Sequence, residues 1–133
     1  MTHQFLNPAH WKRPSGYSNG MAASGRLVVT GGIIGWNNDY EFETDDFAAQ
    51  VDQALRSIVE VLAEGGARPE HIVRMTWYVT DKQEYLAALR DIGQSYKAHI
   101  GRHYPAMALV QVVALVEDRA KVEIEVTAVI PEG

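Results

Sequence analysis

Residues 104–113 (YPAMALVQVV) and 120–131 (AKVEIEVTAVIP) decide the fold of this chain, because both have the composition of β-strands. In a strand, successive side chains point to opposite faces of the sheet. The second segment therefore carries an apolar face made of Val122, Ile124, Val126 and Ala128. Its other face carries Glu123, Glu125 and Thr127. Two acids on one face of such a strand are either exposed to solvent or functional.

Two helices are predicted upstream, from apolar residues at steps of three and four. The first follows residues 44–46 (TDD), which offer capping oxygens, and ends at residues 65–66 (GG). Its apolar stripe is Phe47, Val51, Leu55, Ile58 and Leu62. The second follows Asp81 and ends at Gly101. Its stripe is Tyr85, Leu89, Ile92, Tyr96 and Ile100.

Further strands are predicted around these helices. Residues 72–80 alternate, with one face made of Val73, Met75, Trp77 and Val79. Residues 17–24 and 26–30 are predicted to form a hairpin across a glycine-containing turn. The first fifteen residues are expected to be an irregular lead-in, because two prolines interrupt them. The order ββ(β)αβαββ predicts a single α+β domain over residues 1–133.

Both helices are expected on one face of a mixed sheet, because crossovers between parallel strands are right-handed. The other face then has no helical cover. The residues assigned to it are too apolar for open water, namely Val28, Met107, Leu109, Val113 and Val129. A second subunit is the simplest cover, so we expect a homo-oligomer.

Composition excludes several classes of protein. The 133 residues are 47% apolar and 22% charged, as in an ordinary globular domain. A net charge of −5 without a basic cluster argues against a nucleic-acid partner. No apolar run has the length of a membrane span, and no signal peptide is recognisable. The absence of cysteine fits a reducing cytosol, so we expect a cytoplasmic protein with no membrane partner.

Five short segments carry a resemblance to a known family: VVTGG at 28–32, QVxxAL at 50–55, HIVRMTWYVTD at 71–81, YPA at 104–106 and VEIEVTAV at 122–129. In order and spacing they are similar to the Rid/YjgF family of reactive-intermediate deaminases, also described as endoribonuclease L-PSP-like proteins. The resemblance implies an α+β, chorismate-mutase-like fold with two helices on one sheet face. It also implies a homotrimer with a ligand cleft at each subunit interface.

The resemblance implies an activity as well. Family members of known activity hydrolyse enamines and imines to a keto acid and ammonia, with no metal and no bound cofactor. We therefore expect a deaminase of reactive imine or enamine metabolites that acts in an inter-subunit cleft. The alternative is a family protein that binds a small metabolite without turnover, as a sensor or regulator. Ribonuclease activity fits poorly with the acidic net charge.

Four residues match functional positions of the family. Glu123 falls on the acid that positions the attacking water, a task suited to a carboxylate. Tyr17 corresponds to the tyrosine of the cleft. Gly32 and Leu109 match substrate-binding positions of the cleft wall. Glu123, Tyr17 and Gly32 also have ordinary structural interpretations, as an exposed acid, a cover for the sheet edge and a turn glycine.

One departure from the family pattern is clear. Met107 stands where deaminating members carry an arginine that binds the substrate carboxylate, so the chain resembles a subgroup without it. A thioether cannot make these charge-assisted hydrogen bonds, each of which contributes about 1.5–3 kcal/mol. The candidate replacements are Arg102, His103, Arg26 and Arg74, although a solvated surface or interface position is the favoured interpretation of each. His103 is the substrate-binding candidate because imidazole titrates near neutrality.

A metal site is not expected. His99 and His103 have a spacing that binds metal on a helix, but Gly101 between them ends the predicted helix. No third ligand is evident in the sequence. The glycines at 31, 32 and 35 follow a strand but lack the spacing of a phosphate-binding loop.

Overall fold

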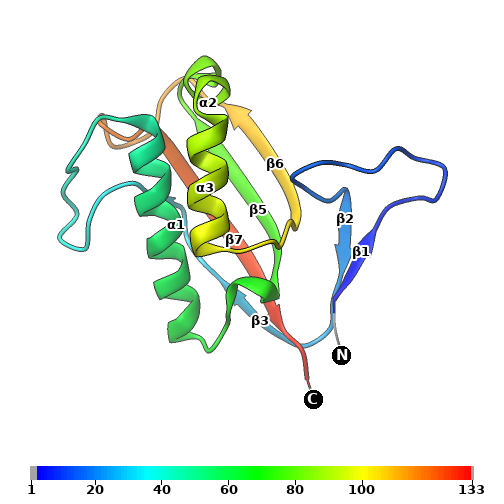
Figure 1. The fold of residues 1–133 in the computed structure, drawn as a ribbon. Helices are drawn as coiled ribbons and strands as arrows, with labels where there is room; N and C mark the ends of the chain where they lie inside the picture. Colours follow the sequence, from blue (N-terminus) through cyan, green and yellow to red (C-terminus); the bar gives the residue numbers. More distant parts are fainter. Residues whose placement is uncertain (1–2, 133) are drawn as a thin grey trace.

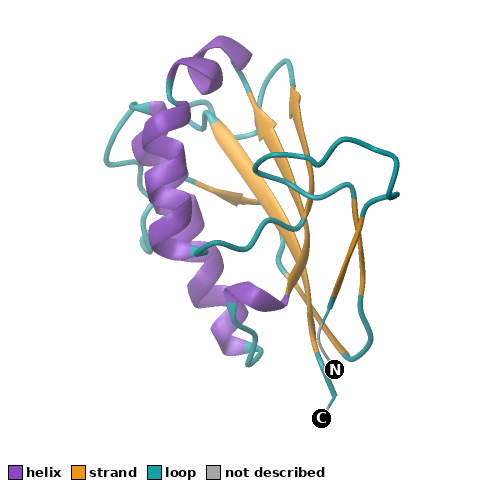
Figure 2. Ribbon diagram, turned by 45° about the vertical axis from the view of Figure 1, so that its right-hand side comes forward, coloured by secondary structure: helices purple, strands orange, loops and turns teal. Residues whose placement is uncertain are grey.

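The computed structural model describes residues 3–132, which form a β-sheet with helices on one face (Figure 1, Figure 2). The strands are β1 (Gln4–Leu6), β2 (Gly20–Ala22), β3 (Arg26–Val29), β4 (Ile33–Ile34), β5 (Ile72–Val79), β6 (Ala106–Gln111) and β7 (Val122–Ile130). The helices are α1 (Phe47–Glu64), α2 (Lys82–Ala87) and α3 (Leu89–His99), with a 3-10 turn, η1 (Pro69–His71), before β5. The predicted α+β class is confirmed.

Strand β7 lies inside the main sheet, whose order is β3-β7-β5-β6, with β4 also paired to β7. It runs antiparallel to β3, β4 and β5. Strands β5 and β6 are parallel, because α2 and α3 return the chain to the start of the sheet between them. Helices α1 and α3 cover the same face, as predicted (Figure 2).

Helix α1 forms where the sequence predicts it. The Asp46 carboxylate accepts a hydrogen bond from the Ala49 backbone N–H at 2.9 Å, which caps the first turn. The predicted stripe is fully buried in the core: Phe47, Val51, Leu55, Ile58 and Leu62. The helix ends before Gly65, and Gly66 adopts a left-handed φ of 81° that glycine tolerates best. None of the helices in residues 3–132 is long and apolar enough to cross a membrane.

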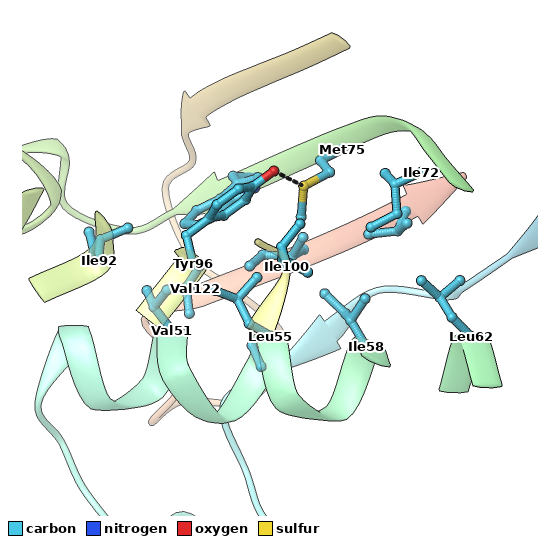
Figure 3. Close-up of a cluster of buried hydrophobic side chains, with 14 of the residues drawn as sticks. Val51, Leu55, Ile58, Leu62, Ile72, Met75, Ile92, Tyr96, Ile100 and Val122 are labelled. Carbon is cyan, nitrogen blue, oxygen red and sulfur yellow. Dashed lines mark hydrogen bonds between the residues drawn. The ribbon is translucent and has the colours of Figure 1, made fainter. Parts of the chain in front are cut away.

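The core lies between α1, α3 and the sheet (Figure 3). From α3, the buried Tyr96 reaches toward Met75 of β5, with its hydroxyl 3.8 Å from the sulfur. One buried polar side chain, Gln50, is fully satisfied. Its amide nitrogen donates to the carbonyl oxygens of Thr44 (3.1 Å) and Arg119 (3.0 Å), and its oxygen accepts from the Lys121 N–H (2.9 Å). These bonds tie α1 to the start of β7.

The core face of β5 differs from the prediction at one position. Met75, Trp77 and Val79 are buried as expected. A β-bulge between Ile72 and Arg74 shifts the register, so Ile72 is fully buried and Val73 only partly.

The prediction of one helix from Asp81 to Gly101 is wrong. The Asp81 carboxylate caps α2, but the helix breaks at Ala88, whose φ of −111° and ψ of 14° are not helical. Because of the break, the predicted apolar stripe is divided between two helices, and its residues no longer all face the same way. Ile92, Tyr96 and Ile100 reach the core, whereas Leu89 remains 50% exposed.

The predicted hairpin is also wrong. Strand β2 pairs with β1, within residues expected to be irregular, and β3 pairs with β7. Gly25, at φ 145°, lies so close to the end of β7 that a Cβ there would be 2.8 Å from the Ile130 carbonyl carbon. After β2 the chain therefore turns at Gly25 and continues as β3, which pairs with β7 instead of with β2. Residues 3–22 form an N-terminal arm whose loop extends away from the sheet beside β6 (Figure 1).

The uncovered sheet face carries exposed apolar residues beside polar ones, but most of the residues predicted to lie on it lie elsewhere. Met107 pairs with Met75, Leu109 with Trp77 and Val28 with Ala128, so all three lie on the helix-covered face. Val113 lies in the loop after β6. Only Val129 is placed as predicted, paired with Leu27. The exposed apolar residues of this face are Leu27 (63%), Val29 (57%) and Val110 (45%).

Candidate functional site

Most of the residues expected to be functional from the sequence line two separate cavities. The first, the tyrosine pocket, has a volume of about 570 Å³ and lies between the arm, α3 and β6. Tyr17 of the arm lies against the edge strand here, beside Met107 and Leu109. The remaining lining residues are Ser15, Gly16, Trp77, Tyr85, Leu89, Ile92, Gly93, Tyr96 and Tyr104. This lining is apolar and phenolic, with no charged side chain.

Backbone contacts hold Tyr17 at this place. The next residue, Ser18, donates its N–H to the Pro105 carbonyl at 3.0 Å and its hydroxyl to the Tyr104 carbonyl at 2.5 Å. The Tyr104 ring stacks on Tyr96, with centroids 5.6 Å apart. The arm and the YPA segment are therefore one structural unit, although they are far apart in sequence.

The second cavity, the glutamate pocket, has a volume of about 520 Å³ and contains Glu123 and Gly32. Strand β4 places them together, because Ile34 pairs with Glu123. A Cβ built on Gly32 would overlap the Glu123 carboxylate and lie 2.7 Å from its carbon. A glycine at position 32 thus leaves room for the acid. The other lining residues are Ile33, Ile34, Trp36, Asn37, Asn38, Tyr40, Ser57, Glu60 and Val61.

The two acids of β7 differ in their partners. The Glu125 carboxylate accepts a hydrogen bond from the Tyr78 hydroxyl at 2.9 Å, and this bond raises the pKa of Tyr78. Within residues 3–132, the Glu123 carboxylate has neither a hydrogen bond nor an ion pair to another side chain. Glu123 is therefore the acid that is free to contact a ligand or a water molecule.

A single chain does not bring the two groups of residues together. Met107 and Leu109 lie on the helix-covered face through their pairing with Met75 and Trp77. Glu123 pairs with Tyr78 and lies on the opposite face. Each cavity therefore contains only some of the predicted site residues.

His103 lies outside both cavities. Its Nε2 is 2.6 Å from the Ile72 carbonyl oxygen, and its ring packs edge-on against Phe5 at 5.7 Å. His99, the other member of the spaced pair, contacts Asp52 at 2.9 Å. Within the described part of the chain, no group of three His, Cys, Asp or Glu side chains is arranged to hold a metal ion.

The glutamate pocket also has an aromatic wall, which the sequence analysis did not predict. Trp36 stacks on Tyr40 at 4.6 Å, and both line the cavity that contains Glu123. Tyr40 has a positive φ of 62°, which is rare outside glycine and asparagine. A turn of this kind has no periodic pattern, so only the aromatic composition of residues 36–42 pointed to it.

The fold and the paired cavities define a class of small α+β proteins that comparison with known proteins identifies. The chain belongs to the family described as Endoribonuclease L-PSP, whose pattern matches residues 10–130, and which includes the Rid/YjgF proteins. A protein of the conserved Rid family from Yersinia pestis, YyfB, described as of unknown function, has a similar structure. Its TM-score is 0.85 at 32% identity, over 98% of this chain and 100% of that one.

Two curated relatives are similar over most of their length. A RutC family protein from Aquifex aeolicus is 33% identical over 113 residues, which cover 85% of this chain and 87% of that protein. A 2-iminobutanoate/2-iminopropanoate deaminase from Escherichia coli is 30% identical over 108 residues, or 79% of this chain and 80% of the enzyme.

Proposed function

We propose that this protein hydrolyses a reactive imine or enamine metabolite to a carbonyl compound and ammonia. The observation that carries the proposal is the unpaired Glu123 carboxylate beside Gly32 in a cavity. Similarity to an enzyme named as an imine deaminase supports the same reaction type. The overall reaction adds one water across the C=N bond and then breaks the C–N bond.

In this proposal Glu123 takes a proton from the attacking water, whose oxygen bonds to the imine carbon. That proton then passes to the nitrogen, which gives a carbinolamine. A second transfer moves the hydroxyl proton to the amine, and the intermediate collapses to C=O as the C–N bond breaks and ammonia leaves. Tyr17 donates a hydrogen bond to the substrate. Gly32, Met107 and Leu109 contact it, and the absence of a side chain at Gly32 lets the ligand approach the acid.

The proposed site is completed by self-association. Met107 and Leu109 of the tyrosine pocket point to the opposite sheet face from Glu123 of the glutamate pocket, so in this proposal the tyrosine pocket of one copy meets the glutamate pocket of another. The apolar side chains exposed on the uncovered face, Leu27, Val29 and Val110, supply a reason to associate. A homotrimer, as the family resemblance implies, would contain three such clefts.

The lining favours an apolar substrate. Met107, Leu109 and Trp77 form an uncharged wall in the tyrosine pocket. A bulky apolar side chain on the substrate would bury this surface at about 25 cal/mol per Å². Neither pocket contains Lys, Arg or His, so neither provides a cation for a substrate carboxylate.

The test is ammonia release from imines generated in the assay by an amino-acid oxidase acting on leucine, phenylalanine or methionine. Glu123→Gln should lower the protein-catalysed rate of ammonia release by about 10²–10⁴-fold, the usual contribution of a general base. Glu125→Gln is the matched control on the same strand, because the amide still accepts the bond from Tyr78. The proposal fails if wild-type protein accelerates none of these reactions, or if both variants keep full activity.

Met107 favours a second candidate function, in which the same cleft binds a metabolite without turnover. Without an arginine at position 107 to bind its carboxylate, an anionic substrate is held less firmly in the geometry that catalysis requires. A sensor would bind the keto acid and release no ammonia. Binding of the keto acid detected by calorimetry, together with no ammonia release in the assay, would favour this second function.

A further inference from the structure

We propose that the N-terminal arm carries an anion-binding site in which Arg13 and Arg102 hold the carboxylate of an apolar or aromatic ligand. The anion site stands on its own observations. Its assignment to an imino acid, as the replacement for the arginine missing at Met107, rests on the proposed function.

The arm encloses a cavity distinct from the two pockets described above. This arm cavity has a volume of about 570 Å³ and lies between the loop of residues 7–19 and the segment before β6. The Asn19 side-chain amide donates to the Asn7 side-chain oxygen at 2.7 Å, which closes the base of the loop. The Trp11 N–H donates to the Pro8 carbonyl at 3.0 Å, which forms a turn within it. Together with the anchoring of Ser18 on the YPA segment, these bonds give the cavity an ordered wall.

The charge of the arm cavity is opposite to that of the protein. The chain has a net charge of −5, yet the lining includes two arginines, Arg13 and Arg102, and no acid. Across the described residues, neither guanidinium has an ion pair with a carboxylate. Arg56, Arg68 and Arg119 each pair with an acid. Other arginines of the described chain are unpaired too, so what sets Arg13 and Arg102 apart is that both line one cavity that has no acid in its lining. Two unpaired guanidinium groups at one cavity favour an anion, and their fork of N–H groups suits a carboxylate.

The rest of the arm-cavity lining favours a ligand in which the anionic group is attached to an apolar or aromatic part. Trp11, Tyr17 and Tyr104 contribute aromatic surface, and Phe5 and Leu6 contribute further apolar surface. A volume of this size accommodates a small organic molecule rather than an inorganic ion alone. An aromatic or branched 2-imino or 2-oxo acid combines the two features.

The arm cavity and the tyrosine pocket share Gly16, Tyr17 and Tyr104 as a common wall. A ligand held at the arginines would therefore lie next to Tyr17, on the other side of the wall that faces Met107 and Leu109. This arrangement explains how a family member can carry methionine at position 107: the cation lies on the other side of Tyr17.

The experiment is titration calorimetry of the full chain with phenylpyruvate, a stable 2-oxo acid with an aromatic group. The double variant Arg13→Gln, Arg102→Gln should bind it about 10- to 100-fold more weakly than wild type. Arg56→Gln, which removes a surface arginine already paired with Asp52, should bind it like wild type. Phenylacetone, which lacks the carboxylate, should bind wild type and double variant with equal, weaker affinity. Circular dichroism checks that each variant is folded, and Arg13→Lys, Arg102→Lys, which keeps the charge, should recover part of the affinity.

The result separates this inference from the proposed function. Arginine-dependent binding with no ammonia release keeps the anion site and contradicts the hydrolase. Ammonia release that the double variant retains in full, at the wild-type KM, contradicts the assignment of the site to an imino acid and keeps the hydrolase. Equal phenylpyruvate affinity of wild type and double variant, or no binding to wild type at millimolar concentration, overturns the anion site.

Discussion

Replacing Gly32 by alanine should abolish most of the proposed activity and leave the protein folded. The added Cβ would lie 2.7 Å from the carboxylate carbon of Glu123 and 3.0 Å from its Cγ. Since carbon atoms pack at about 3.5–4.0 Å, the acid must move by about 1 Å. A misplacement of about 1 Å can lower a catalytic rate by about 100-fold. The Glu123 side chain is flexible, and Gly32 has no left-handed φ, so the free energy of unfolding should change by less than about 1 kcal/mol.

Two neighbouring glycines provide the controls. Gly31→Ala places its Cβ in open space, with no atom within 4 Å, and should keep both activity and stability. Gly35→Ala places its Cβ 2.6 Å from the Cβ and the carbonyl oxygen of Gln50 on α1. Helix backbone cannot swing aside, so this variant should lose about 1–3 kcal/mol of stability or more.

The assays are ammonia release from the generated imines and urea denaturation of all three variants. A Gly32→Ala protein as active as Gly31→Ala would refute the role of Glu123. A Gly32→Ala protein as unstable as Gly35→Ala would show that its Cβ clashes with something less mobile than a side-chain carboxylate.

Three further predictions concern stability and are measured by urea denaturation. Ile58→Ala should cost about 2–5 kcal/mol because Ile58 is fully buried, and a loss below about 1 kcal/mol would contradict its place in the core. Asp46→Ala should cost about 1 kcal/mol through loss of the α1 cap, and Asp46→Asn should recover most of it. Burial raises the pKa of Asp52, but hydrogen bonds and the charge of His99 outweigh it, so the folded pKa is lowered. The stability that Asp52 contributes is therefore fully present above its ordinary pKa of 3.8. This stability is lost as the pH falls through the lower pKa of the folded state. The stability gap between wild type and Asp52→Asn should narrow on acidification, and a constant gap would contradict the shift.

The periodic parts of the fold were predictable from sequence. The stripe of α1 and the alternation of β7 each repeat a local rule over many residues, so the core residues Leu55, Ile58 and Ile124 follow directly. The resemblance to the Rid/YjgF family rests on the same segments. Local rules also predicted the helix cap at Asp46, because capping depends only on the adjacent turn.

The placement of the site residues was not predictable, because it depends on register. Moving a strand by one residue exchanges its two faces, and the alternation of residues 106–111 is weak. Only the pairing of Met107 with Met75 shows that Met107 lies on the helix-covered face. The arm was missed for a related reason: β1 and β2 are three residues long, and Ser18 is anchored by carbonyls more than eighty residues away.

The proposed division of the site between copies leads to a last prediction, on mixed assemblies. If the tyrosine pocket of one copy meets the glutamate pocket of the next, Tyr17→Ala and Glu123→Gln each damage a different half of every cleft. Each variant alone should be inactive. In an assembly refolded from an equal mixture, about a quarter of the clefts combine two intact halves, since each half is intact in half of the copies and contacts are head-to-tail. Ammonia release should then return to about a quarter of the wild-type rate. A mixture that stays inactive although native mass spectrometry shows mixed assemblies would contradict the division of the site between copies.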